Sequence, residues 1–288
     1  MIQARNKLSQ EELFEAKKLI DCCQAYDGTY RDPYLSNMLN FDPNMPAFFL
    51  YYEKGELVGL LTVYADDQDV EVTILVHPDH RRQGIARALY RSFEKETASY
   101  PIESVTFQTE RVFLDRHPDF VSNWGLVEDE DTETWLGKDR RPYPLEKLSN
   151  LEVLLADSSY QEQISQLKFQ AFSEEHEYRE IVDRYVAEAL KDPESRLYIL
   201  LKDDQVIGTC TVDLSSDTNY FYGLAISEPE RGKGYGSYLA KSLVNQLIEQ
   251  NDKEFQIAVE DSNVGAKRLY EKIGFVKQTP VVYLNAKE

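Results

Sequence analysis

Two glycine-containing segments rich in basic residues indicate chemistry more clearly than any other part of the sequence. They are Arg81-Arg82-Gln83-Gly84-Ile85-Ala86 and, 150 residues later, Arg231-Gly232-Lys233-Gly234-Tyr235-Gly236. A glycine turn between a strand and a helix leaves backbone N–H groups without partners and lets a ligand approach the main chain closely. Such N–H groups, together with the helix dipole, favour an anion and above all a phosphate. The sequence therefore predicts two phosphate-binding turns, each with added positive charge.

Other phosphate-binding motifs fit these turns less well. A Walker A loop needs Gly-Lys followed by Ser or Thr, whereas Lys233 is followed by Gly234. A dinucleotide fingerprint needs a glycine three places after Gly234, and that place holds Ser237. A tight turn with no ligand is the alternative for either copy alone, and the repetition of the pattern argues against it.

The elements that must position the turns follow one order in both halves of the chain. That order is helices, hairpin, strand, glycine turn, helix, strand, helix, strand. The strand-like segments are 47–64, 72–76, 105–108 and 132–136 in the first half, and 197–214, 221–226, 255–259 and 281–284 in the second. With 288 residues the chain is long enough for two such domains. We expect them at residues 1–140 and 150–288, with their boundary in the polar, proline-containing segment 138–150.

The charge of the chain excludes one class of partner. There are 51 acidic against 32 basic residues, a net charge of −19, and both halves are acidic. Neither half offers the basic face that nucleic acid requires, so no nucleic-acid partner is expected. An acidic surface aids solubility and would also suit a cationic substrate.

Other residue types point to a cytoplasmic protein without metal. The sequence has no apolar signal-peptide core and no run of membrane length, so we expect no membrane association. Its three cysteines, Cys22, Cys23 and Cys210, form neither a disulfide framework nor a metal-binding pair. His77 and His80 flank a proline and lack a plausible third ligand, so no metal site is expected.

Both turns belong to a pattern that resembles a known family. Arg81-x-x-Gly84-x-Ala86 and Arg231-x-x-Gly234-x-Gly236 resemble the pyrophosphate loop of the GNAT N-acetyltransferases. The second half adds Asn263-x-x-Ala266-x-x-Leu269-Tyr270-x-x-x-Gly274-Phe275, which is similar to the next motif of that family. The first half matches only in the loop and the order of elements. The resemblance implies two tandem α/β domains, each a twisted mixed sheet flanked by helices, with coenzyme A between splayed fourth and fifth strands.

The resemblance also implies roles for individual residues. Backbone N–H groups from Gly232 to Ser237 would hold the pyrophosphate, and the Leu224 N–H would polarise the acetyl carbonyl. Tyr270 would protonate the departing thiolate, its other interpretation being a core aromatic, and Asn263 would cap its helix or bond the pantetheine. The coenzyme-binding residues implied in this way are Leu224, Ile226, Arg231, Gly232, Lys233, Gly234, Tyr235, Gly236, Ser237 and Asn263, with Arg81, Arg82, Gln83, Gly84, Ile85 and Ala86 in the first half.

The general base is not decided by the sequence. Where some relatives carry a glutamate on the strand, this chain has Tyr220. The candidate carboxylates of the second half are Glu174, Glu175, Asp213 and Glu260. In the first half, Glu71 is the obvious strand-borne carboxylate, while Val121 and Leu114 stand at the places of Tyr270 and Asn263.

These observations lead to one expected function and two alternatives. We expect an acetyl-CoA-dependent N-acetyltransferase that acts on a primary amine of a small molecule or peptide by direct attack, with the second half catalytic. The alternatives are a non-catalytic acyl-CoA sensor or interaction module, and a transferase of aminoacyl or longer acyl groups. The acceptor would be set by residues 26–41 and 169–178, and the protein would be a monomer or homodimer.

Overall fold

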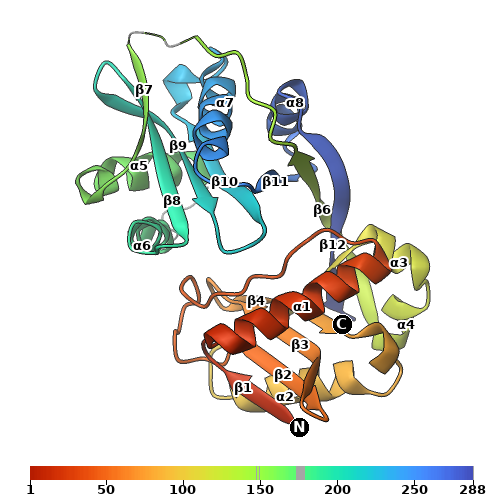
Figure 1. Ribbon diagram of the computed structural model, residues 1–288. Coiled ribbons are helices and arrows are strands. Elements are labelled where there is room, and N and C mark those ends of the chain that lie inside the picture. The colour runs from red at the N-terminus through yellow and green to blue at the C-terminus, as the bar shows by residue number, and fades with distance from the viewer. Residues whose placement is uncertain (147, 149, 173–178, 288) are drawn as a thin grey trace. The chain divides into compact units, whose positions relative to one another are not determined.

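A computed structural model describes residues 1–146, 148, 150–172 and 179–287. The chain forms two compact units (Figure 1). Unit 1 comprises Met1–Glu133 and Thr279–Glu288, and unit 2 comprises Thr134–Gln278. Each unit is a mixed sheet flanked by helices, which confirms the predicted fold class.

Unit 1 contains a sheet of strand order β1-β2-β3-β4-β5-β12. Its strands are antiparallel to their neighbours except for β4 and β5, which are parallel. The strands are β1 (Ile2–Arg5), β2 (Phe48–Glu53), β3 (Glu56–Tyr64), β4 (Asp69–Val76), β5 (Ser104–Glu110) and β12 (Val276–Ala286, of which residues 279–286 belong to unit 1). The helices are α1 (Gln10–Asp27), η1 (Pro78–His80), α2 (Ile85–Thr97), α3 (Arg111–Arg116) and α4 (Phe120–Trp124).

Unit 2 repeats this plan with the order β7-β8-β9-β10-β11-β6. Here β10 and β11 are the parallel pair. The strands are β7 (Leu151–Leu155), β8 (Ser195–Lys202), β9 (Gln205–Asp213), β10 (Thr218–Ile226), β11 (Glu254–Glu260) and β6 (Leu126–Lys138, of which residues 134–138 belong to unit 2). The helices are η2 (Ser158–Tyr160), α5 (Gln161–Phe172), α6 (Arg179–Ala189), η4 (Glu228–Glu230), α7 (Tyr235–Ile248) and α8 (Val264–Lys272).

The last strand of each sequence half does not stay with its own half. In unit 1, β12 lies beside β5, with Val281 opposite Glu110 and Asn285 opposite Thr106. The end of β6 lies beside β11 in unit 2. The sequence analysis placed a strand at the end of each half without assigning its sheet, because an alternating apolar pattern indicates a strand without indicating which sheet edge it joins. The domain limits 1–140 and 150–288 describe the two copies of the sequence repeat, whereas the compact units are defined by which residues pack together. These limits therefore stay a proposal.

The two faces of each sheet are covered by different helices. Successive residues of β2 show this alternation, because Phe49 packs in the core beneath α2 whereas Leu50 packs beneath α1. In unit 2, Ile199 packs beneath α5 and α6, and its neighbour Leu200 packs beneath α7. Strands buried on both faces explain why the hairpins at 47–64 and 197–214 read as nearly continuous apolar runs.

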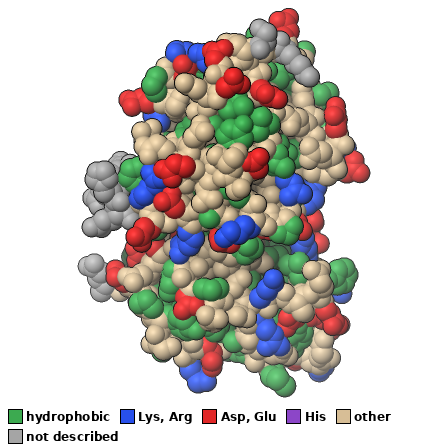
Figure 2. Space-filling model, turned by 90° about the vertical axis from the view of Figure 1, so that its left-hand side faces the viewer, with side chains coloured by type: hydrophobic (Ala, Val, Ile, Leu, Met, Phe, Trp, Pro, Cys, Tyr) green, Lys and Arg blue, Asp and Glu red, His purple; other side chains and the backbone are tan. Residues whose placement is uncertain are grey.

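The surface carries charges of both signs. On the face that Figure 2 shows, acidic and basic side chains are interspersed. Over the described ranges of the chain, the helices are all too short or too polar to cross a membrane.

Candidate active site

In each unit the parallel strand pair separates towards its carboxyl end. Pairing of β4 with β5 runs from Asp69 opposite Ser104 to Val72 opposite Phe107 and then stops, although both strands continue. Pairing of β10 with β11 likewise stops after Phe221, which lies opposite Ile257. Each unit therefore has a gap between its two parallel strands, at the end of the sheet where ligands of α/β proteins usually bind.

A glycine turn follows each splayed strand and has the same conformation in both units. Gly84 and Gly234 have φ of 83° and 88°, and they are the N-caps of α2 and α7. Two residues earlier, Arg82 and Gly232 are also left-handed, with φ of 62° and 75°. Neither helix has a side-chain cap or an acidic residue in its first turn. The first N–H groups of both helices are therefore suited to bind an anion.

The arginine that opens each turn braces the loop. Arg81 donates from Nε to the Val76 carbonyl (2.9 Å), and Arg231 donates in the same way to the Ile226 carbonyl (3.0 Å). Arg81 also forms a bidentate ion pair with the buried Asp27 (2.7 and 2.6 Å). The sequence analysis assigned these arginines to charge complementarity, and the structure adds that each fixes the turn to the end of the preceding strand.

A cavity of about 560 Å³ occupies the splayed end of unit 1. It is lined by residues 72–76 of β4 and 107–110 of β5, and by Phe120. From the first-half turn, the lining residues are Arg81, Arg82, Gly84, Ile85 and Ala86, whereas Gln83 does not line the cavity. A cavity of this size is typical of a small-molecule or cofactor site.

Unit 1 has a half-buried carboxylate on its splayed strand. Glu71 of β4 lies opposite Thr106 of β5, as Tyr220 of β10 lies opposite Gln256 of β11, so the two positions correspond. Burial raises the pKa of Glu71 to about 7, although the Arg31 guanidinium lowers it. A carboxylate with a pKa near 7 is well suited to accept a proton at neutral pH.

Tyr270, the proton donor implied for the second half, lies in the core of unit 2. It lies on α8 with 6% of the residue exposed, and its ring centre is 6.1 Å from that of Phe275. Burial raises the pKa of Tyr270 well above its usual range, and the Cys210 thiol adds to that shift. Tyr270 is protonated at neutral pH, as any tyrosine is, and burial makes its proton harder to release.

The matching region of unit 1 has no phenol. Phe120, which lines the cavity, and Val121 stand near the corresponding place, and neither can donate a proton. In unit 2, Asn263 caps α8 by accepting a hydrogen bond from the Ala266 N–H (3.1 Å), which was one of its two expected roles.

The candidate bases of unit 2 differ in their surroundings. Burial raises the pKa of Asp213, which accepts hydrogen bonds from the Ser215 N–H (2.7 Å) and hydroxyl (2.9 Å). Glu260 is exposed at the end of β11. Glu174 and Glu175 lie outside the described residues.

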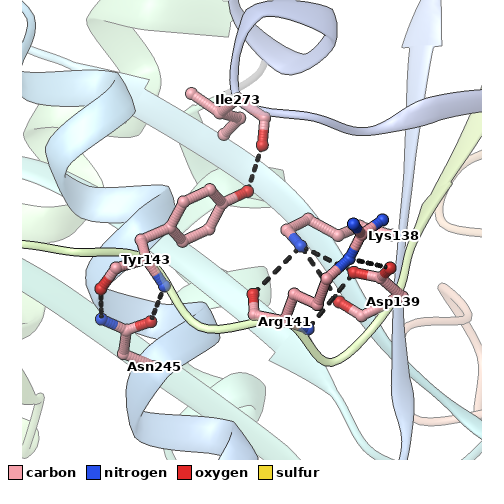
Figure 3. Close-up of polar contacts among 6 residues, drawn as sticks. All are labelled: Lys138, Asp139, Arg141, Tyr143, Asn245 and Ile273. Atoms are coloured by element: carbon pink, nitrogen blue, oxygen red, sulfur yellow. Dashed lines mark hydrogen bonds and ion pairs between the residues drawn. The ribbon is translucent and has the colours of Figure 1, made fainter.

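The segment expected to be a boundary is fixed to the site helices of unit 2 (Figure 3). The backbone N–H and carbonyl of Tyr143 bond the side chain of Asn245 on α7 (2.8 and 2.9 Å). The Tyr143 hydroxyl donates to the carbonyl of Ile273, which follows α8. This clasp ties the helix that starts at the glycine turn to the helix that carries Tyr270. The sequence analysis did not identify it, because a polar, proline-containing stretch is typical of a loop.

Sequence analysis also missed Lys168, a buried lysine of α5 beside β9 and β10. Its position within the apolar face formed by Ile164 and Leu167 was the signal available in the sequence. The described part of the chain contains no group of three or more His, Cys, Asp or Glu arranged to hold a metal ion.

Comparison with known proteins fits this geometry. The chain is 26% identical over 230 residues to a mycothiol acetyltransferase of Clavibacter sepedonicus, covering 76% of this chain and 73% of that protein. A GCN5-related N-acetyltransferase of Sphaerobacter thermophilus has a similar fold, with a TM-score of 0.71 and 18% identity, covering 99% of this chain and 94% of that one. A tandem GNAT protein from the clavulanic acid biosynthesis pathway has a TM-score of 0.70 and 16% identity, covering 99% and 98%.

The family itself is shown by the sequence. The acetyltransferase (GNAT) family matches twice, over residues 13–119 and 160–275, so each match contains one glycine turn and one splayed strand pair. The chain therefore belongs to the GNAT family of acetyltransferases, as an enzyme built from two tandem GNAT domains.

Proposed function

We propose that the protein transfers the acetyl group of acetyl-coenzyme A to a primary amine of a small molecule or peptide. The observation that carries this proposal is the splayed strand pair that ends at the uncapped start of a helix, present in both units. The pyrophosphate would bind the N–H groups of the turn, which the helix dipole makes favourable. The pantetheine would lie in the gap between the strands, against Leu224–Ile226 in unit 2, where β10 has no partner on β11.

Unit 2 is the proposed site of transfer. The amine attacks the thioester carbon directly, and the Leu224 N–H stabilises the charge on the carbonyl oxygen. Tyr270 gives its proton to the departing thiolate. The place of Tyr270 on α8, the helix that follows the splayed strand β11, supports this role.

The acceptor amine must lose a proton before or during its attack, since an alkylammonium has a pKa of ~10.4. Tyr220 stands where unit 1 carries Glu71, so β10 offers no carboxylate at that position. Asp213, whose backbone lies opposite that of Tyr220 on β9, is the described carboxylate nearest to this place in register. We propose that it receives the proton through water.

Unit 1 is proposed to bind coenzyme A without transferring the acetyl group. The 560 Å³ cavity and the braced turn support binding, and Phe120 and Val121 in place of a phenol argue against transfer. Glu71 gives unit 1 a candidate base without an acid, whereas unit 2 has a candidate acid and carries no carboxylate at the corresponding position of its splayed strand, which is Tyr220. This division favours a binding role for unit 1 beside a catalytic unit 2.

Isothermal titration calorimetry with acetyl-coenzyme A tests the binding part of the proposal. Wild-type protein should bind two molecules, while Gly84→Val and Gly234→Val should each lose one, because a side chain would occupy the space that the coenzyme needs. Gly125→Val and Gly274→Val are matched controls, since both glycines also have positive φ with open space around them (67° and 86°) but lie outside the turns. Unchanged binding in both turn variants would refute the proposal.

A further inference from the structure

Lys168 is a buried cation to which the proposed transfer has assigned no role. It lies on α5 with 7% of the residue exposed. Its ammonium donates a hydrogen bond to the Thr211 hydroxyl (3.0 Å) and lies 5.7 Å from the centre of the Tyr222 ring. Among the residues that the structure describes, no carboxylate forms an ion pair with it.

A buried ammonium without a counter-ion lowers the stability of the folded protein, so its presence suggests a function. Burial lowers the pKa of Lys168 to about 8, although Cys210 acts in the opposite direction. One turn earlier on the same face of α5, the buried hydroxyl of Ser165 has no hydrogen-bond partner within the described chain. Among the described residues, the Lys168 ammonium has one hydrogen-bond partner and the Ser165 hydroxyl has none, so both groups can form a further hydrogen bond to a ligand.

The ammonium lies at the bulge of the splayed strand β10. The register with β9 shifts between Tyr222 and Ala225, and pairing with β11 has already ended at Phe221. Gly223 in this bulge has a φ of 58°, and a Cβ on it would lie 2.7 Å from Nζ of Lys168. Glycine is therefore required here by its backbone angle and by the closeness of the ammonium. The next residue is Leu224, whose N–H is proposed to polarise the acetyl carbonyl.

Unit 1 places a cation at the corresponding point from a different element. Arg31, which follows α1, donates to the Thr73 hydroxyl (3.0 Å). Thr73 is the first residue of β4 beyond the pairing with β5, as Tyr222 is the first residue of β10 beyond the pairing with β11. The negative charge of Glu71 acts on Arg31, whereas no carboxylate of the described residues does so on Lys168. Among the described residues, the positive charge of Lys168 is therefore not neutralised by a carboxylate and can act on a ligand.

We propose that Lys168 is a catalytic residue of unit 2, whose ammonium stabilises the negative charge that develops on the acetyl carbonyl oxygen. This inference rests on the proposed function. As the amine attacks, the C–N bond forms and the carbonyl π electrons move onto oxygen. They return as the C–S bond breaks, the thiolate takes its proton from Tyr270, and the amine proton leaves to the base. Lys168 exchanges no proton in this sequence, and a fixed charge in a dry site is an effective stabiliser of such a transition state.

Two coenzyme A analogues test the position of the ammonium without knowledge of the acceptor. S-carboxymethyl-coenzyme A carries a carboxylate close to where the acetyl oxygen would lie, and S-ethyl-coenzyme A carries a neutral group of similar length. Calorimetry in a Gly84→Val background isolates unit 2. The carboxymethyl analogue should bind roughly tenfold to a hundredfold more tightly, the usual strength of a charge-assisted hydrogen bond. Lys168→Met should abolish that preference, and Lys191→Met, which alters an exposed lysine, should keep it.

Turnover supplies the second readout. Release of coenzyme A from acetyl-coenzyme A, with cysteamine, cadaverine, L-lysine and glucosamine as acceptors, should show a kcat in Lys168→Met reduced by roughly 10²- to 10³-fold. The affinity for acetyl-coenzyme A should change little. Lys168→Gln serves as a second variant, and circular dichroism verifies that both are folded.

The outcomes separate this inference from the proposed function. If wild type and Lys168→Met show the same preference for the carboxymethyl analogue and the same kcat, the role of Lys168 is overturned and the proposed function stands. This result is expected if water is the hydrogen-bond partner of the ammonium. Acetylation of Nζ itself, detected by peptide mass spectrometry, would also overturn it, because an amide carries no charge. A wild-type protein that binds neither analogue and releases no coenzyme A would overturn both.

Discussion

Replacing Lys168 by methionine should make unit 2 more stable at neutral pH. The structure gives the magnitude, because burial lowers the pKa of this lysine from its ordinary 10.5 to about 8. At pH 7 the ammonium then costs the folded state roughly 3 kcal/mol relative to the unfolded chain. Methionine has a similar length and no charge, and the Thr211 hydroxyl loses a hydrogen bond worth about 1 kcal/mol. The variant should therefore gain about 2 kcal/mol.

The pH dependence has a definite sign. The folded pKa lies below the unfolded one, so the destabilisation is fully present below pH 8 and fades as the pH rises towards 10.5. Above that pH the lysine is neutral in both states, and the advantage of the variant should disappear. A gain in stability that accompanies a loss of activity is typical of a residue kept for function.

Urea denaturation followed by tryptophan fluorescence measures this effect. The chain has two tryptophans, Trp124 in unit 1 and Trp135 in unit 2, so a Trp124→Phe background makes the signal specific for unit 2. Lys191→Met is the control for removing a lysine from the surface. A Lys168→Met protein less stable than wild type at pH 7, or a difference that stays constant from pH 7 to 10.5, would refute the reasoning.

Three further changes have expected outcomes. Tyr270→Phe should lower kcat on the order of 10²- to 10⁴-fold with little change in the calorimetric affinity for acetyl-coenzyme A, and an unchanged kcat would remove Tyr270 from the mechanism. Between pH 4.5 and 7 the wild-type unit 1 should lose stability, because the folded pKa of Glu71 is about 7 and ionisation of this carboxyl opposes folding. Glu71→Gln should abolish that loss. Thermal melts at the two pH values measure the change, and an equal loss of stability in both proteins would contradict the prediction. Tyr143→Phe should destabilise unit 2 by about 1 kcal/mol in urea through the lost bond to Ile273, and no change would show that the hydroxyl bond is dispensable.

Local patterns in the sequence predicted the fold well. The two glycine turns, the hairpins and the strand-to-helix order gave the tandem GNAT architecture, because each depends on residues adjacent in sequence. The partners of β6 and β12 could not be predicted in this way. A strand's alternating pattern shows that it has a buried face, while the sheet it joins is set by contacts far apart in sequence.

Sequence reasoning could predict the backbone conformation of the candidate site but not the long-range contacts of its side chains. Left-handed conformations at Gly84 and Gly234 follow from residue type and spacing. The bracing of the turn by Arg81 through Asp27 depends on a contact across 54 residues, and the raised pKa of Glu71 depends on burial. Lys168 was missed because a lysine on a helix is usually exposed, although its place on the apolar face with Ile164 and Leu167 indicated burial.

The most direct test of the central claim, that unit 2 carries out acetyl transfer, compares the two turns in one turnover assay. Gly84→Val and Gly234→Val would be measured for release of coenzyme A in the presence of an accepted amine, with Gly125→Val and Gly274→Val as controls for strain at positive φ. The account predicts that Gly234→Val abolishes turnover, while Gly84→Val and both controls retain most of it. Loss of turnover in Gly84→Val with full activity in Gly234→Val, or equal partial losses in the two, would contradict it.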